Sequence, residues 1–217
     1  MSAPGAEGKL PLTALGAVSI LERLGEGGRS TVYRAVHLGR EVVLKVYKSR
    51  AVVRHARKHP LPLPRYEYLR NAAFFAVPGL AEFVAEPFGY FDADGASALV
   101  QERLDGELYY FHWKRLEGKV DERLRAQLSR ILELAHGAGL YDVDMHAMNV
   151  MVVRGDDGRP RAKLFDFNLI PFHVRPPNPL VGLLLRTGLM DARARDLRKL
   201  RNFHDFRRVE KKLLGFY

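Results

Sequence analysis

Short runs of alternating apolar and polar residues dominate the first half of the chain and predict β-strands. A glycine-rich turn separates the first two runs, and the turn at residues 92–95 separates the last two. These runs lie at residues 20–24, 31–36, 41–47, 85–91 and 98–104. The pattern therefore predicts a small sheet of five strands.

Helical spacing of apolar residues is clearest at residues 121–137, where Leu124, Leu128, Ile131, Leu132 and Ala135 predict a buried helical face. Other segments predict further elements. A helix is expected at 65–77, with an apolar face of Tyr68, Leu69, Ala72, Phe75 and Ala76. A short apolar helix is expected at 181–186, and a basic helix or helix pair at 191–214. The stretch 49–64 ends in three alternating prolines and predicts an exposed loop.

Charge and composition narrow the kinds of partner. The chain has 217 residues, a formal net charge of +10 and no cysteine. Such a charge suits an anionic partner. The alternative explanation of the charge is a soluble protein with a basic face. The lack of cysteine fits a reducing cytoplasm, and no apolar run approaches the roughly 20 residues of a membrane span. Residues 1–8 do not have the pattern of a signal peptide.

Two short stretches carry the residues needed for phosphoryl transfer. Asp144 and Asn149 form a D-x-x-x-x-N pattern between a polar turn and an apolar strand, and Asp166 follows a second apolar strand. Transfer of a phosphoryl group requires a carboxylate to accept or orient the proton of the attacking hydroxyl. It also requires an amide oxygen and a second carboxylate to hold Mg²⁺ on the phosphates. The three side chains supply one candidate for each role.

The first hairpin carries a second set of candidates. Gly25, Gly27 and Gly28 lie in its turn, where the lack of a Cβ lets the backbone approach phosphate oxygens closely. Ser30 closes the turn, and Lys45 interrupts the apolar run of the third strand. A glycine-rich hairpin followed by V-x-L-K is much more specific than either part alone.

These motifs resemble the protein-kinase-like superfamily. The family's phosphate loop, G-x-G-x-x-G-x-V, matches residues 25–32 with Ser30 in place of the last glycine. Lys45 matches the lysine that binds the α- and β-phosphates of ATP. The resemblance implies a helix glutamate as its partner, for which Glu67 is chosen and Glu82 is the alternative. It also implies a hinge at 102–106 that holds adenine through its backbone and begins at Glu102.

The family pattern H-x-D-x-x-x-x-N, followed by D-F-G, matches this chain with two departures. Asp142 stands where the family has histidine, and Asn168 replaces the glycine. The resemblance implies Asp144 as the catalytic base, with Asn149 and Asp166 as Mg²⁺ ligands.

His146, two residues after the expected base, could reach the transferring phosphate. The alternative is a histidine that is hydrogen-bonded within its loop. The D-x-H-x-x-N pattern is also similar to aminoglycoside and choline kinases.

The resemblance implies an α+β, two-lobed kinase-like fold with ATP and Mg²⁺ between the lobes. Residues 1–16 would be a disordered tail. Residues 17–103 would form an N-lobe with a five-stranded antiparallel sheet, and residues 104–217 a compact, truncated helical C-lobe. Only 49 residues follow Asn168 and they contain no A-P-E motif, which leaves no room for the usual substrate platform.

This compact ending resembles small bacterial lipopolysaccharide-core kinases of the Kdo or heptose type. It is also similar to kinase-like proteins of the PhoP regulatory network. The expected activity is ATP-dependent phosphorylation of a lipopolysaccharide-core sugar hydroxyl by a cytoplasmic protein. An anionic glycolipid or the inner-membrane surface would be its partner. The alternatives are a protein or small-molecule kinase and a regulatory, nucleotide-binding pseudokinase. Specific nucleic-acid binding has only the net charge in its favour.

Overall fold

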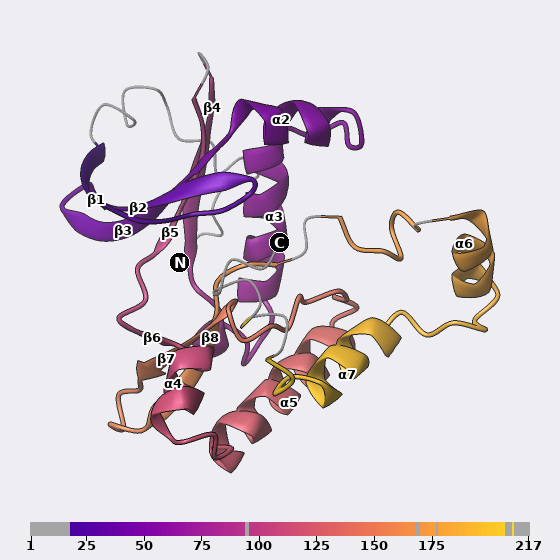
Figure 1. Cartoon of the computed structure of the whole chain (residues 1–217). Helices are drawn as coiled ribbons and strands as arrows, with labels where there is room; N and C mark the ends of the chain where they lie inside the picture. Colours follow the sequence, from indigo (N-terminus) through magenta and orange to yellow (C-terminus); the bar gives the residue numbers. More distant parts are fainter. Residues whose placement is uncertain (1–17, 94–95, 168–169, 177, 207–209, 211–217) are drawn as a thin grey trace. The chain divides into compact units, whose positions relative to one another are not determined.

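The computed structural model describes the chain except for residues 1–17, 94–95, 168–169, 177, 207–209 and 211–217 (Figure 1). The chain divides into two compact units. The first takes in the described residues of Met1–Phe75 and Ala85–Arg103, and the second those of Ala76–Val84 and Leu104–Tyr217. Residues 76–84, within the range expected for the N-lobe, therefore cluster with the second unit. The expected tail at 1–16 lies outside the described residues.

The first unit is built on one antiparallel sheet, which confirms the predicted five-stranded architecture (Figure 1). Its strand order is β1-β2-β3-β5-β4. The side chains of Ala35, Val42, Leu44, Phe91 and Val100 form its buried core cluster with Ala98. The strands are β1 (Val18–Glu26), β2 (Ser30–His37), β3 (Arg40–Tyr47), β4 (Pro87–Ala93) and β5 (Ala96–Glu102).

Two helices complete the first unit, and the first of them corrects a sequence expectation. The stretch 49–64 is not all loop, because α2 (Ser49–Ala56) forms there and buries Ala51 and His55 one helical turn apart. The prolines that suggested a loop all come after α2 has ended. Pro64 lies in the first turn of the next helix, α3 (Leu63–Phe75), where proline costs little.

The predicted helix at 65–77 is therefore present as α3, but it buries a different face. α3 packs against β4 and β5. Its buried residues include Glu67, Tyr68, Asn71 and Phe74, whereas Leu69 is 36% exposed. The apolar pattern misplaced the face because two polar side chains are buried on it. One of them, Glu67, meets a buried cation on the sheet.

The second unit consists of a three-stranded antiparallel sheet, ordered β6-β7-β8, with helices around it. A short 3₁₀ helix, η1, contacts β8. The elements are η1 (Ala81–Phe83), β6 (Gly106–Leu108), α4 (Tyr109–Arg115), α5 (Glu122–Gly137), β7 (Val150–Arg154), β8 (Pro160–Leu164), α6 (Pro179–Arg186) and α7 (Ala194–Arg201).

Helix α5 is the core helix of this unit, as predicted. The carboxylate of Asp121 caps its N-terminus by accepting hydrogen bonds from the backbone N–H groups of Arg123 and Leu124. At its other end Gly139 adopts a φ of 73°, and the N–H of Leu140 donates to the carbonyl of Ala135. The helix thus delivers the chain in a fixed direction to the polar turn at 142–149.

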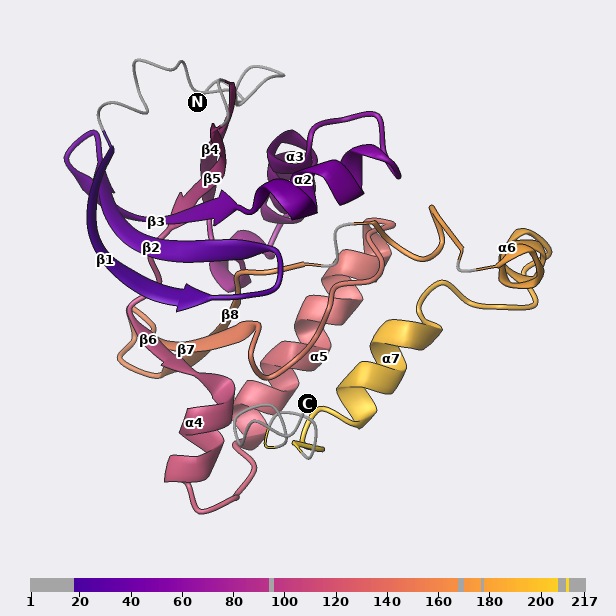
Figure 2. The same cartoon turned by 45° about the horizontal axis from the view of Figure 1, so that its top comes forward.

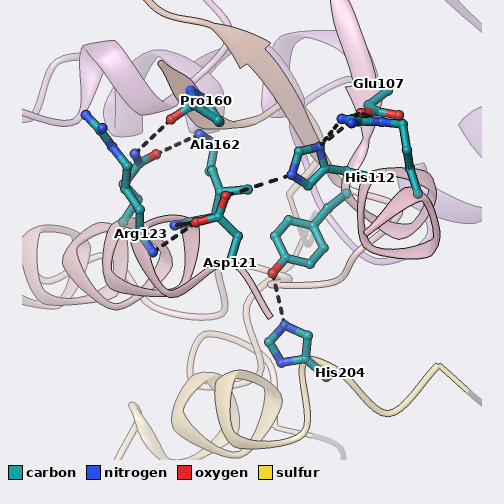
Figure 3. A network of polar contacts seen from close by, with 11 residues as sticks. Glu107, His112, Asp121, Arg123, Pro160, Ala162 and His204 are labelled. Carbon is teal, nitrogen blue, oxygen red and sulfur yellow. Dashed lines mark hydrogen bonds and ion pairs between the residues drawn. The ribbon is translucent and has the colours of Figure 1, made fainter. Parts of the chain in front are cut away.

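Polar contacts join the start of α5 to its neighbours (Figure 3). The ring of His112 bonds Glu107 and lies 3.9 Å from Asp121. The side chain of Gln127 holds β8 through the Pro160 carbonyl and the Ala162 N–H. These bonds tie α4, α5 and β8 into one frame.

The C-terminal basic segment is only partly helical among the described residues. The predicted helix or helix pair at 191–214 appears as α7, which ends at Arg201, followed by turns that bury Phe203 and Phe206. Helix α7 lies alongside α5 in both views (Figures 1 and 2). The described part of the chain contains no helix with the length and apolar character needed to span a bilayer.

Candidate active site

In the first unit, Lys45 and Glu67 form a buried ion pair. The Nζ of Lys45 lies 2.6 Å from Oε1 of Glu67, and the two side chains are 10% and 2% exposed. Strand β3 aims Lys45 at the face that α3 covers. The alternative partner, Glu82, instead pairs with Arg161 in the second unit. Burying such an ion pair costs desolvation energy, so stability alone does not explain why the pair is present.

The glycine turn is open around its backbone. Its own hydrogen bond runs from the N–H of Gly27 to the carbonyl of Ser30, at 2.8 Å. A Cβ added to Gly25 or Gly28 would meet nothing within 4 Å, and neither residue, nor Gly27, has positive φ. The fold of the described residues therefore does not itself require glycine at these positions. The space beside the backbone would allow close approach by a ligand such as a phosphate.

Neighbouring side chains position this turn. Glu26 accepts a hydrogen bond from Lys48, which holds the pKa of the Glu26 carboxyl below its usual range. The guanidinium of Arg50 donates to the Gly28 carbonyl at 3.4 Å. Ser30 is buried, with 5% of its surface exposed. The turn thus has basic side chains beside an open backbone, which suits an anionic ligand.

Glu102 ends strand β5, at the start of the expected hinge. Its backbone N–H donates to the carbonyl of Glu86, and its carboxylate accepts from the N–H of Glu86. These bonds use Glu102 to fix the end of the sheet. Adenine binding by residues 102–106 stays a prediction.

In the second unit, the β7–β8 hairpin brings the other predicted residues together. Asn149 immediately precedes β7, and Asp166 follows β8. Because Val150 pairs with Leu164, these two flanking positions meet at the open end of the hairpin. The backbone confirms the closeness, since the N–H of Phe165 donates to the Asn149 carbonyl at 3.3 Å.

Asp144 is hydrogen-bonded to Asn149. The Nδ2 of Asn149 donates to the carbonyl oxygen and to Oδ2 of Asp144, each at 3.2 Å. The residues that sequence reasoning selected for proton acceptance and metal binding are therefore adjacent in space. His146 is exposed, and its Nδ1 accepts from the N–H of Met148, which fits the alternative of a histidine bonded within its loop.

The backbone of this loop is strained and held from outside. Asp142 and Asp144 both have φ values of 60°, a region that non-glycine residues rarely adopt. The fully buried carboxylate of Asp196, on α7, accepts from the N–H groups of Asp142 and Val143 at 2.8 and 2.9 Å. Asp196 also bonds His136, at the end of α5. Such strain persists only where the surroundings determine the conformation, as at functional sites.

The structure gives a role to Asp142, which departs from the family pattern. Its side chain is fully buried and accepts from the N–H of Phe172 and from Arg195, at 3.1 and 3.0 Å. Arg195 therefore neutralises a buried charge. The second departure, Asn168, lies outside the described residues.

Sequence reasoning missed two α7 residues that bear on the site. Asp196 supports the loop, and the Nζ of Lys199 contacts Oδ1 of Asp144 at 2.5 Å. Both lie in the segment 191–214, which the sequence predicted only as a basic helix or helix pair. For Lys199 a signal was available in the sequence. Arg195, Lys199 and Asn202 are spaced at i, i+4 and i+7, so they are expected to share one helical face.

The donor set fits a magnesium ion held together with phosphates. Asn149 uses its Nδ2 on Asp144, so its amide oxygen is not needed for that contact. Asp166 follows the strand that pairs with the one after Asn149. Amide and carboxylate oxygens are the ligands that Mg²⁺ prefers, and it is usually bound by one or two protein ligands plus substrate phosphates. No group of three or more histidine, aspartate or glutamate side chains able to hold a metal by themselves occurs among the described residues.

Comparisons with known proteins concern the fold of the chain. No family model matches the chain. The serine/threonine-protein kinase Pkn1 of Myxococcus xanthus is 27% identical over 194 residues, which cover 85% of this chain and 26% of Pkn1. The chain thus spans about a quarter of the length of this curated relative.

The crystal structure of the PknI kinase domain of Mycobacterium tuberculosis superimposes with a TM-score of 0.52 at 21% identity. The match covers 70% of this chain and 60% of the PknI chain. The chain therefore has the protein-kinase-like fold, and the predicted α+β fold class is confirmed.

Proposed function

We propose that this chain is an ATP-dependent phosphotransferase that acts on a hydroxyl group. The observation that carries the proposal is the joining of Asp144 to Asn149, with Asp166 at the adjacent end of the β7–β8 hairpin. The protein-kinase-like fold supports it. The same fold supports the assignment of the sheet with the glycine turn as N-lobe, up to about residue 103, and of the following residues as C-lobe.

The proposed chemistry assigns one task to each side chain. Asp144 orients the acceptor hydroxyl and receives its proton as the acceptor oxygen bonds to the γ-phosphorus of ATP. The bond from that phosphorus to the β–γ bridging oxygen breaks, so the products are a phosphate ester and ADP. Asn149 and Asp166 would hold Mg²⁺, which when bound neutralises charge on the phosphates. His146 is the proposed hydrogen-bond donor to the transferred phosphate, through the ring nitrogen that does not accept from the Met148 N–H.

The first unit supplies the proposed nucleotide contacts. Lys45, fixed by Glu67, would bind the α- and β-phosphates beneath the turn of Gly25, Gly27, Gly28 and Ser30. Glu102 and the residues after it would hold adenine. Convergence of these residues with Asp144 on one nucleotide stays a prediction.

Replacing Lys45 by Met should weaken Mg²⁺-ATP binding at least tenfold in calorimetry, because the ammonium that contacts the phosphates is lost. The variant also leaves Glu67 buried without its cation, which would destabilise the fold. The double variant Lys45→Met/Glu67→Gln removes that problem and is the decisive one. Tight ATP binding by this folded double variant would refute the assignment. Lys119→Met, at an exposed site, should bind as the wild type does.

For the acceptor we propose a sugar hydroxyl of the lipopolysaccharide core, with the protein at the cytoplasmic surface of the inner membrane. The support is the basic C-terminal segment of the sequence, including Arg207, Arg208, Lys211 and Lys212, which lie outside the described residues. A protein acceptor is the second candidate. It is favoured by the similarity to Pkn1, which is named a serine/threonine-protein kinase, and to the PknI kinase domain. A pseudokinase would bind nucleotide without turnover.

Replacing those four basic residues by Gln should strongly weaken binding to anionic vesicles at low salt. Each cation near such a surface contributes about 1 kcal/mol, and salt screens it. Cosedimentation at two salt concentrations measures the effect, and melting curves exclude lost stability. ATP affinity should stay unchanged. Equal vesicle binding by a normally folded quadruple variant would remove the support for a membrane-surface acceptor.

A further inference from the structure

A cavity of about 500 Å³ lies within the second unit, between the loop that follows Asp144 and one face of α7. We refer to it as the α7 cavity. Its lining residues are Met145, His146, Ala147, Arg195, Arg198, Lys199, Asn202, Phe203, Asp205 and Phe206. The volume is within the range of small-molecule sites and suits a ligand of the size of a single sugar derivative.

The wall formed by α7 is strongly basic. Arg195, Arg198, Lys199 and Asn202 share one face of the helix, and Asp205 is the acidic residue of the lining. Arg195 bonds Asp142, and Lys199 bonds Asp144. Among the residues that the structure describes, the Arg198 side chain has no hydrogen bond or ion pair. Within the described part of the chain, the exposed Arg198 is thus a cation of the cavity lining that no carboxylate neutralises.

The other wall is aromatic and firmly packed. Phe203 and Phe206 are only 5% and 4% exposed. The ring of Phe203 packs edge-on against Tyr109 at 4.8 Å, and the ring of Phe206 lies 4.5 Å from that of Trp113. The hydroxyl of Tyr109 forms a hydrogen bond with the ring of His204, which is labelled in Figure 3. Cations that line one cavity with rigidly packed aromatic rings are suited to an anionic ligand that also has a carbon skeleton.

The contact between Lys199 and Asp144 adds a constraint on that ligand. Lys199 occupies Oδ1 of Asp144, and Asn149 donates to Oδ2. An acceptor hydroxyl needs one of these oxygens. An anionic group on the acceptor would attract the Lys199 ammonium away from Oδ1, whereas a neutral alcohol would have to share this oxygen with the cation.

We propose that the α7 cavity is the acceptor site and binds an alcohol that carries its own anionic group, namely a phosphorylated or carboxylated sugar. This inference rests on the proposed phosphotransferase function and specifies its substrate class. Arg198 and Lys199 hold the anion, and the sugar carbons lie against Phe203 and Phe206. The acceptor hydroxyl then takes the place of Lys199 at Asp144.

Direct binding tests the site without any turnover. Isothermal titration of the full chain with glucose 6-phosphate, glucuronate, inorganic phosphate and glucose separates the contributions of phosphate, carboxylate and sugar. At least one anionic sugar should bind ten times more tightly than glucose and than inorganic phosphate. Trp113 is the single tryptophan of the chain, and its fluorescence should change on binding because it contacts Phe206.

Three matched variants of α7 locate the anion. Arg198→Gln and Lys199→Met should each weaken binding of the anionic sugar at least tenfold. Arg201→Gln removes the same charge from the same helix, but Arg201 does not line the cavity, so it should change binding less than twofold. Equal effects of Arg201→Gln and Arg198→Gln would show a general response to net charge and overturn the inference. So would anionic sugars that bind no more tightly than glucose.

Titrating ATP with Mg²⁺ into the same samples separates this inference from the proposed function. Sugar binding without ATP binding would support the anionic site and reject the kinase assignment. ATP binding without anionic-sugar binding would support the kinase assignment and reject the anionic acceptor site. If Lys199→Met weakened binding of ATP but not of the sugar, Lys199 would serve the nucleotide and the acceptor assignment would be wrong.

Discussion

Replacing Asp144 by Asn should reduce phosphoryl transfer by at least a hundredfold while ATP affinity changes less than threefold. The substitution keeps the size of the side chain and an oxygen that can accept from Asn149. It removes the charged oxygen that would take the proton of the acceptor hydroxyl. General-base catalysis of this kind is worth roughly 10²–10⁴ in rate. A loss confined to the transition state lowers kcat and kcat/KM together.

The measurement is transfer of labelled phosphate to a panel of alcohols, with ATP binding followed by calorimetry. Asp156→Asn is a suitable control, because this exposed carboxylate lies in the turn between β7 and β8. It should have the activity of the wild type. Equal turnover by the Asp144 variant would reject this residue as the base. A wild-type chain that binds ATP but transfers nothing to any acceptor would favour the pseudokinase.

The sheet and the polar loop were predictable because local sequence determines them. Alternating runs identified the five strands, and the helical spacing of apolar residues at 121–137 located α5. The D-x-x-x-x-N spacing predicted that Asp144 and Asn149 act together, and the structure places their side chains in contact. In each case the signal depends on neighbours in sequence or on one helical period.

The buried polar contacts were harder to predict because they depend on tertiary partners. Apolar spacing on α3 indicated the wrong face, and only the family resemblance suggested that Glu67 would pair with Lys45, as it does in the structure. The prolines after residue 59 hid α2, although they lie beyond its end. Asp196 and Lys199 looked like parts of a solvated basic helix. Their roles follow from the packing of α7 beside a loop some 50 residues earlier in the chain.

Replacing Asp196 by Ala should cost on the order of 3–5 kcal/mol of unfolding free energy. Its carboxylate is fully buried and accepts from two backbone N–H groups, those of Asp142 and Val143. Alanine would leave both donors buried without a partner, each at a cost of about 1–3 kcal/mol. It would also leave two positive-φ residues, Asp142 and Asp144, with one fewer restraint.

Chemical denaturation of the Asp196 variants measures this loss, and the conservative change provides the scale. Asp196→Asn keeps one acceptor oxygen and should lose about half as much stability as Asp196→Ala. Transfer activity should fall in both variants even at temperatures where they remain folded, because the restraint lies directly before Asp144. A structural role alone would leave the activity of the folded fraction unchanged. If Asp196→Ala had the same midpoint denaturant concentration as the wild type, the loop would hold its conformation without this contact from α7. The assignment of Asp196 as the support of the loop would then be wrong.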